Sequence, residues 1–242
     1  MATANAQTFS HPGMLNNAGD LNRAKAGVSA GTEPSRSAWE RLQNSQYPGV
    51  NGSYTASPVA TVTDTGSRSE AILHDSEAAY VNAIEWWITG NQIYANTAIG
   101  ILNAWASTCT LINGSNAELA ANIDFFDLVN AAEIIRYSNS GWSSANITTF
   151  SNFLTNVIYP VISSSNYDSW GSGSNLMMMM IGIFNNDATV YNQGYNNFTS
   201  TNAAVACWTC LDTGKYIPSS SAIRSTCVRN SCGIANGRQQ RS

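Results

Sequence analysis

Histidine is the side chain best suited to move a proton near neutral pH, and this chain contains only two histidines. His11 precedes Pro12-Gly13 near the N-terminus, and His74 precedes Asp75, where a helix is expected to begin. A catalytic histidine would have to be one of these two. His11 is a candidate substrate ligand that could equally fix the course of the chain. His74 is a candidate catalytic residue that could equally cap the helix or lie on the surface.

Several other side chains have types and positions that suggest a site. Asn130 and Glu133 lie in an otherwise apolar helical segment, so each needs hydrogen-bond partners, and Asn130 is also a candidate for binding substrate. Trp170 lies in a Gly/Ser-rich stretch that predicts a loop and could stack on a sugar ring, whereas Trp105 has the helical spacing of a core residue. The four consecutive methionines at 177–180 point in different directions around a helix, which predicts core packing instead of soft-metal binding.

The cysteines do not form a convincing metal site. Five are present, an odd count that leaves at least one unpaired, and four lie near the C-terminus: Cys207, Cys210, Cys227 and Cys232. The second pair is separated by four residues, and no zinc-ribbon hairpin pattern surrounds either pair. We therefore expect no metal and no cofactor.

Helical periodicity dominates the middle of the chain and predicts an all-α protein. Weaker helical patterns run from Leu15 to Val28 and around Trp39, and the Gly/Ser/Thr/Pro-rich stretch 47–69 predicts a long surface loop. Stronger patterns then predict three successive helical hairpins, formed by 75–87 with 92–107, 125–137 with 143–158, and 172–184 with 188–198. Antiparallel hairpins in series predict an incomplete α/α toroid or a straight solenoid.

The C-terminal part differs from the rest. After Asp212 the chain has no acidic residue and five basic ones, without helical periodicity. We expect one helical domain over residues 1–206 and an atypical, disordered tail over 207–242.

Composition restricts the possible partners. The 242 residues include 11 Lys and Arg against 15 Asp and Glu, a net charge of −4 that argues against a nucleic-acid surface. No apolar run approaches the ~18 residues needed to cross a bilayer. Sequons begin at Asn51, Asn113, Asn146 and Asn197 and favour an extracellular protein, although the N-terminus lacks the basic and apolar regions of a signal peptide. We expect a monomer outside the cell.

Motifs along much of the chain carry a family resemblance. They begin with Phe9-Ser-His-Pro-Gly-Met-Leu15, Asp20-Leu21 and the stretch 34–39. In the same order follow Asp75-x-x-x-Ala79-Tyr80, Trp87-Ile-Thr-Gly90, Tyr94, Ile101-Leu-Asn-Ala-Trp105, Asn130-Ala-Ala-Glu-Ile-Ile-Arg136-Tyr and Gly141-Trp142. In order and spacing, residues 9 to about 195 resemble the alginate-lyase-like proteins of fungi and bacteria.

The resemblance implies an incomplete α/α toroid whose cleft binds an acidic polysaccharide and cleaves it by β-elimination. A donor neutralises the C5 carboxylate, a Tyr or His takes the α-proton, and an acid protonates the leaving oxygen. The family's Asn-Trp pair falls on Ser169-Trp170, and Ser169 is a shorter donor, so Asn175 one turn further is a candidate replacement.

The family's Glu-Ser-Gly-Arg-Asp-Gln-x-His segment is matched only in part, at Gly237-Arg238 and Gln240, and Arg241 stands in the His position. Arg238 is therefore the remaining candidate for holding a uronate. Because the chain ends here, we expect a truncated lyase of alginate or glucuronan type with impaired chemistry. The alternative is a non-catalytic relative that binds carbohydrate.

Overall fold

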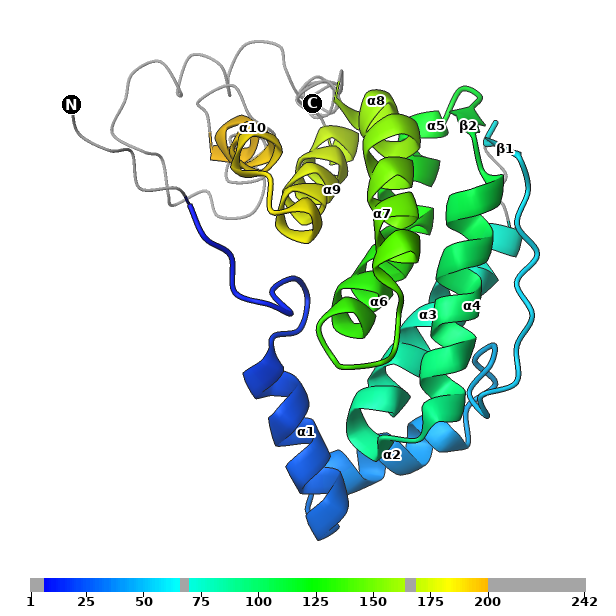
Figure 1. Cartoon of the computed structure of the whole chain (residues 1–242), viewed down its shortest axis with the longest axis vertical. Coiled ribbons are helices and arrows are strands. Elements are labelled where there is room, and N and C mark those ends of the chain that lie inside the picture. Colours follow the sequence, from blue (N-terminus) through cyan, green and yellow to red (C-terminus); the bar gives the residue numbers. More distant parts are fainter. Residues whose placement is uncertain (1–6, 66–69, 164–168, 200–242) are drawn as a thin grey trace, which may run out of the picture.

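The structure is a computed structural model that describes residues 7–65, 70–163 and 169–199 (Figure 1). It is mostly helical, which confirms the predicted all-α class. The predicted tail over 207–242 lies outside the described residues. The helices are α1 (Ala18–Ala30), α2 (Ser35–Gln43), α3 (Glu70–Thr89), α4 (Gln92–Thr108), α5 (Ala117–Leu119), α6 (Phe126–Arg136), α7 (Ser144–Phe153), α8 (Tyr159–Ile162), α9 (Ser169–Asn185) and α10 (Ala188–Thr199).

Three of these helices, α3, α6 and α9, run parallel to one another. Ser76 donates to the carbonyl of Asp124 just before α6, and Trp86, ten residues further along α3, donates to Ser138 just after it. The same order links α6 to α9. The side chain of Asn122 binds the carbonyl of Trp170, and Arg136 binds the carbonyl of Phe184. We call α3, α6 and α9 the inner layer.

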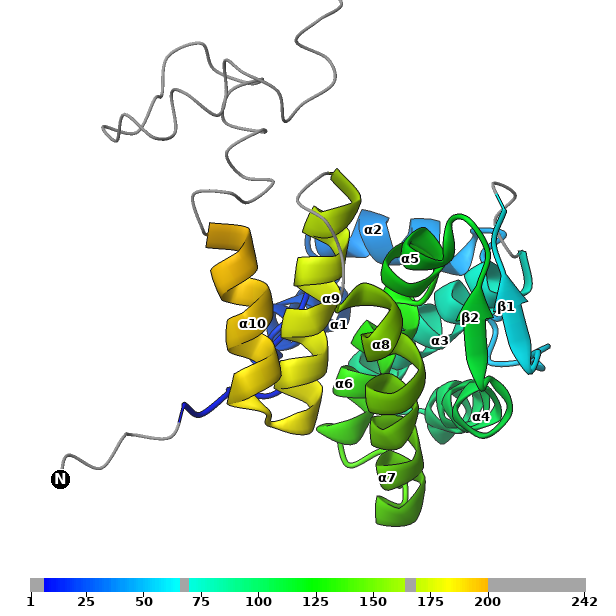
Figure 2. The same cartoon turned by 90° about the horizontal axis from the view of Figure 1, so that it is seen from above.

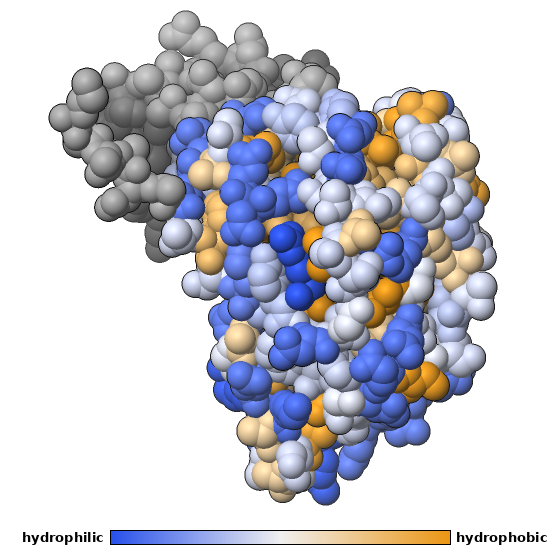
Figure 3. All heavy atoms as spheres, in the orientation of Figure 1, coloured by the Kyte–Doolittle hydropathy of each residue, from blue (hydrophilic) through white to orange (hydrophobic). Residues whose placement is uncertain are grey.

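The remaining long helices pack outside this layer. Helices α4, α7 and α10 each follow an inner-layer helix in the chain, and α4 packs against α3, α7 against α4, and α10 against α9. Helix α1 comes before the inner layer in the chain and packs against α3. Figure 2 shows α10, the α7–α8 pair and α4 on the outer side of α9, α6 and α3. Hydrophilic and hydrophobic residues are interspersed over the face that carries α7 and α8, so this face is not a continuous apolar surface (Figure 3).

Local sequence signals explain where several helices begin. The side chain of Asn91 accepts from the amide of Ile93 and caps α4, and Ser143 accepts from the amide of Asn146 and caps α7. Two glycines allow α9 and α10 to approach closely. A Cβ at Gly182 would lie 2.5 Å from the amide nitrogen of Tyr191, and one at Gly194 would lie 2.5 Å from the carbonyl oxygen of Asn175.

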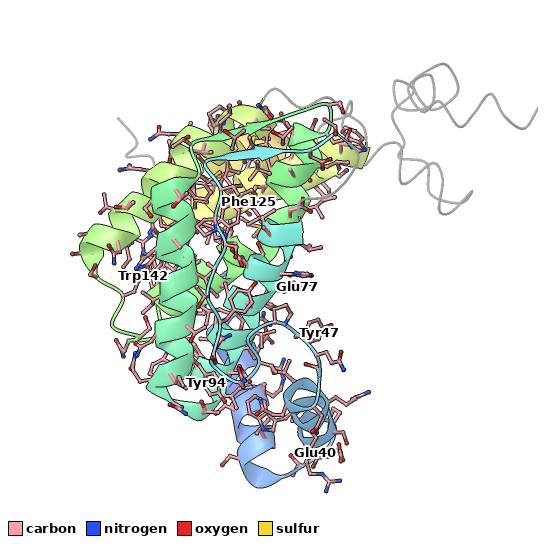
Figure 4. The ribbon with its side chains drawn as sticks, turned by 90° about the vertical axis from the view of Figure 1, so that its right-hand side faces the viewer. Glu40, Tyr47, Glu77, Tyr94, Phe125 and Trp142 are labelled. Carbon is pink, nitrogen blue, oxygen red and sulfur yellow. The ribbon has the colours of Figure 1, made fainter. Side chains whose placement is uncertain are left out.

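The core lies between the two layers and is largely aromatic. Trp105 packs edge-on against Phe125, which leads through Phe153 and Phe150 to Phe184. Figure 4 shows Phe125 enclosed by the helices. Trp105 is fully buried and Met177, Met178 and Met180 are buried, as the sequence predicted, and Met179 is half-buried.

Some elements were not expected from the sequence. Two three-residue strands, β1 (Thr61–Thr63) and β2 (Leu111–Asn113), pair in parallel with Val62 opposite Ile112. Two π-helical turns, η1 (Ala120–Asp124) and η2 (Leu154–Ile158), interrupt the helices, and the second falls inside the stretch 143–158 that was predicted to be one helix. The helix expected to start at Asp75 starts at Glu70, so His74 lies inside α3 and does not cap it.

Asp75 joins the loop before α3 to the helices. Its carboxylate is fully buried and accepts hydrogen bonds from the Tyr54 hydroxyl (2.8 Å), the Ser57 amide (2.8 Å) and the Trp105 indole (2.6 Å). Three donors on one buried carboxylate satisfy it without a counter-charge.

Within the described residues, none of the helices is long and apolar enough to span a membrane.

A second buried carboxyl, Glu85 on α3, makes stability depend on pH. Gln43 donates to one of its oxygens, and the other has no hydrogen-bond partner among the described residues. Burial raises the pKa of Glu85 from 4.5 to about 7, against the lowering effect of Gln43. The folded protein therefore holds this proton more tightly than the unfolded chain, and the contribution of Glu85 to stability falls as pH rises from about 4.5 to about 7.

We predict that Glu85→Gln removes this dependence. The wild type should lose up to about 1.4 kcal/mol of stability per pH unit within that window relative to the variant. Denaturant unfolding of both proteins near pH 5 and near pH 8 measures the difference. If the free energy of unfolding changed equally between the two pH values in both proteins, the assignment to Glu85 would be contradicted.

Candidate functional site

The N-terminal segment, residues 7–17, crosses the inner layer and brings His11 to α6. His11 Nδ1 lies 2.7 Å from Glu133 Oε1, and the same oxygen accepts from the amide of Gly13 at 3.1 Å. Glu133 is 1% exposed. Burial raises the pKa of this carboxyl, while His11 acts in the opposite direction. The histidine and the carboxyl thus form a buried pair that anchors the segment.

The other side of the His11 ring is also occupied. Nε2 lies 3.0 Å from Asn186 Oδ1, and the ring stacks on Tyr137 with centroids 4.0 Å apart and planes 9° apart. The amide of Asn186 in turn contacts the Tyr137 hydroxyl at 3.3 Å. With 12% of its side chain exposed, His11 has little surface left for a ligand.

Asn130 and Asn16 continue the contacts toward α3. Asn130 Oδ1 accepts from the amide of Leu15 at 3.1 Å, and its amide group donates to the carbonyl of Phe126 at 3.0 Å. Asn16 donates to the hydroxyl of Tyr80 on α3. The N-terminal segment therefore supplies the partners of Glu133 Oε1 and of Asn130 Oδ1, and α6 itself supplies the acceptor for the Asn130 amide group.

Two carboxyl groups lie beside Tyr80, each one turn before a polar residue of this cluster. Glu77 precedes Tyr80 on α3, and Asp127 precedes Asn130 on α6. Figure 4 shows Glu77 projecting from α3 on the side away from α4. We call Asn16, Glu77, Tyr80, Asp127 and Asn130 the inner-layer strip; all but Asn130 are half-buried.

The surroundings of the strip raise the pKa of two of its groups, Tyr80 and Asp127. Burial raises the pKa of Tyr80, and the charge of Asp127 adds to this effect, while the hydrogen bond from Asn16 opposes it. Burial also raises the pKa of Asp127, helped by the charge of Glu77. A phenol in this setting is a proton donor at neutral pH, and a carboxylate with a raised pKa is a stronger base than an exposed one.

The remaining candidates from the sequence lie at other places. His74 is exposed on α3, one turn before Glu77. Trp170 is 37% exposed in the first turn of α9, where the sequence suggested a loop, and Asn175 is buried in the same helix. Ser169 begins α9, and its side chain lies outside the described part of the chain, as does Arg238.

Sequence reasoning missed Tyr80, Asp127, Tyr137 and Asn186 as members of one cluster. Tyr80 and Tyr137 belong to recognisable motifs, but their aromatic side chains fit a buried helix equally well. Asn186 lies in the turn after α9, and nothing local shows that it faces a histidine 175 positions earlier in the chain. Across the described residues, no group of three or more His, Cys, Asp or Glu side chains is arranged to hold a metal ion.

Comparison with known proteins adds no relative. No family model matches this chain, and no curated protein and no solved structure matches it. The sequence motifs and the geometry of the cluster are therefore the features of this chain that bear on its function.

Proposed function

We propose that this protein is a polysaccharide lyase of the alginate-lyase-like type, which cleaves a uronic-acid polymer by β-elimination. One observation carries the proposal. Three motifs behind the resemblance, around His11, Tyr80 and Asn130, are separated by 50 or more residues in the chain but meet at the inner-layer strip. Motifs that only shaped the core would not need to place polar groups together on one half-buried surface.

The arrangement of helices supports the finer fold proposal, an incomplete α/α toroid of antiparallel hairpins. Parallel inner helices α3, α6 and α9, each followed in the chain by an outer helix, are what such a toroid requires. Its concave side would be lined by the inner layer, where the strip lies.

Tyr80 is the residue we propose as the acid of the reaction. β-Elimination breaks the bond between C4 and the glycosidic oxygen, and that oxygen needs a proton as it leaves. The raised pKa keeps Tyr80 protonated at neutral pH, and its half-buried hydroxyl is held by Asn16. We further propose that the protein acts outside the cell as a monomer on an acidic polysaccharide.

The runner-up is a non-catalytic relative that binds carbohydrate. It is favoured by the saturation of His11, whose two ring nitrogens are both engaged, and of Asn130, whose amide and carbonyl are both engaged. These contacts hold the N-terminal segment and leave Tyr80, Asp127, Glu77 and Trp170 as the accessible groups.

The test is to incubate the purified full chain with alginate, glucuronan and other polyuronates and to follow the ultraviolet absorbance of unsaturated uronate ends. We expect a time-dependent rise with at least one polymer. A folded sample that binds a polymer without any rise would replace the lyase by the binding relative, and a sample that neither binds nor cleaves would refute both.

A further inference from the structure

The charges around the strip restrict the substrate that a lyase site here could accept. Glu77 and Asp127 are half-buried, and neither makes a hydrogen bond or ion pair within the described residues. Each influences a neighbour electrostatically, because the charge of Glu77 raises the pKa of Asp127 and the charge of Asp127 raises that of Tyr80. The geometry brings both carboxyl groups to this place. Glu77 is one turn before Tyr80 on α3, and Asn16, which donates to Tyr80, follows Leu15, whose amide binds Asn130 one turn after Asp127. Two carboxyl groups beside the Tyr80 hydroxyl make this surface negative.

The described cations lie elsewhere. Apart from Arg136, the described arginines and lysine are all on α1 and α2, where Arg23 pairs with Asp20 and Arg36 pairs with Glu33. Arg136 donates to the carbonyl of Phe184, and its guanidinium stacks over the Tyr137 and Phe184 rings. Helix α3 carries one histidine, the exposed His74, which lies one turn before Glu77.

A free uronate polymer carries one carboxylate per sugar, and removing the C5 proton adds a further negative charge to that group. A lyase for such a polymer has to neutralise the carboxylate. An ester at C6 needs no neutralising charge, since its carbonyl already acidifies the neighbouring C–H bond and is not repelled by nearby carboxylates. The negative surroundings of Tyr80 suit the ester and oppose the free acid.

We propose that the substrate is a polyuronate whose carboxyl groups are esterified, and that Asp127 is the catalytic base. This inference rests on the lyase function proposed above. Asp127 Oδ takes the proton from C5, and the electrons of that bond form the C4=C5 double bond. The C4–O bond breaks, and the leaving oxygen takes the proton of the Tyr80 hydroxyl. Proton transfer from Asp127 back to the Tyr80 phenolate restores both groups, so the cycle consumes no other reactant.

Glu77 has a different role in this scheme. It lies one turn before Tyr80 and makes Asp127 more basic by its charge, so it is a positioning and specificity residue and not a catalytic one. It should matter most when the substrate is itself charged.

The experiment compares methyl-esterified alginate, glucuronan and galacturonan with the same preparations after saponification, using the full chain and unsaturated product as the readout. We expect at least about tenfold faster product formation from an esterified polymer. Asp127→Asn should lower that rate by about 10²–10⁴-fold, the usual contribution of a general base. Glu77→Gln should reduce the preference for ester over free acid. Because Asp127 becomes a weaker base without the charge of Glu77, cleavage of the ester should also slow, but by less than in Asp127→Asn.

Each other outcome has a defined meaning. Equal or faster cleavage of the saponified polymer would overturn the ester preference while leaving the lyase proposal standing. Loss of free-acid cleavage in Arg238→Gln would also overturn the ester preference and leave the lyase proposal standing, because Arg238 would then be the cation that neutralises the uronate carboxylate. Undiminished activity in Asp127→Asn, with a wild-type circular dichroism spectrum, would remove Asp127 as the base. Absence of product from both forms would refute the lyase function and this inference together.

Discussion

Replacing Asp75 with alanine is expected to lower the free energy of unfolding by about 3–5 kcal/mol. The change leaves three donors without an acceptor: the Tyr54 hydroxyl, the Ser57 amide and the Trp105 indole. The indole is fully buried, so water cannot take the place of the carboxylate there without opening the core.

Chemical denaturation of the variant and the wild type measures this loss. Asp20→Ala is the control. Asp20 is a half-buried aspartate on α1 that pairs with Arg23 and accepts from the backbone amide of Asn17 in the helix cap, and the loss of these contacts is expected to cost less than the loss of the three buried hydrogen bonds of Asp75. A loss for Asp75→Ala no larger than that of Asp20→Ala would mean that the three donors find other partners.

Tyr80→Phe is expected to reduce lyase activity by about 10²–10⁴-fold while changing stability by only about 1 kcal/mol. The substitution removes one hydroxyl, which carries the proton for the leaving oxygen in the proposed reaction, and leaves the ring packed against the hydrophobic core. The loss should appear in kcat more than in KM, because the proton is transferred only in the transition state.

Tyr159→Phe provides the control for a lost tyrosine hydroxyl. The Tyr159 hydroxyl donates to Gln193 at 2.6 Å, where α8 meets α10, and takes no part in the strip. Rates of unsaturated-product formation for the two variants should differ by at least about tenfold. Equal activities would exclude Tyr80 as the acid, whatever its effect on folding.

Helical periodicity was sufficient to find the long helices, because each has an apolar face of the right period and a clear stop signal such as Gly90. It could not find β1 and β2, which are three residues each and pair across some fifty positions, so no local pattern distinguishes them from loop. The start of α3 was also placed too late. Ala71 and Ile72 extend the apolar face of that helix, and Ser69 is a residue type common at N-caps, but Ser69 ends the Gly/Ser/Thr/Pro-rich stretch that was predicted to be loop.

The candidate site was only partly accessible from sequence, for a similar reason. Asn130 and Glu133 were noticed because polar residues in an apolar helix require partners, and the structure supplies those partners. Which residues these partners are depends on how the N-terminal segment crosses α9, α6 and α3. That path is determined by tertiary contacts, and the residues involved carry no periodicity of their own.

The course of the N-terminal segment also sets an order on folding during synthesis. His11 leaves the ribosome before its partner Asn186, which lies 175 positions later. The contacts of the segment with Glu133 and Tyr80 need only α6 and α3, whereas its contact with Asn186 can form only after α9 has been made. The segment is thus made before its partners and completes its native contacts only when all three inner-layer helices are present.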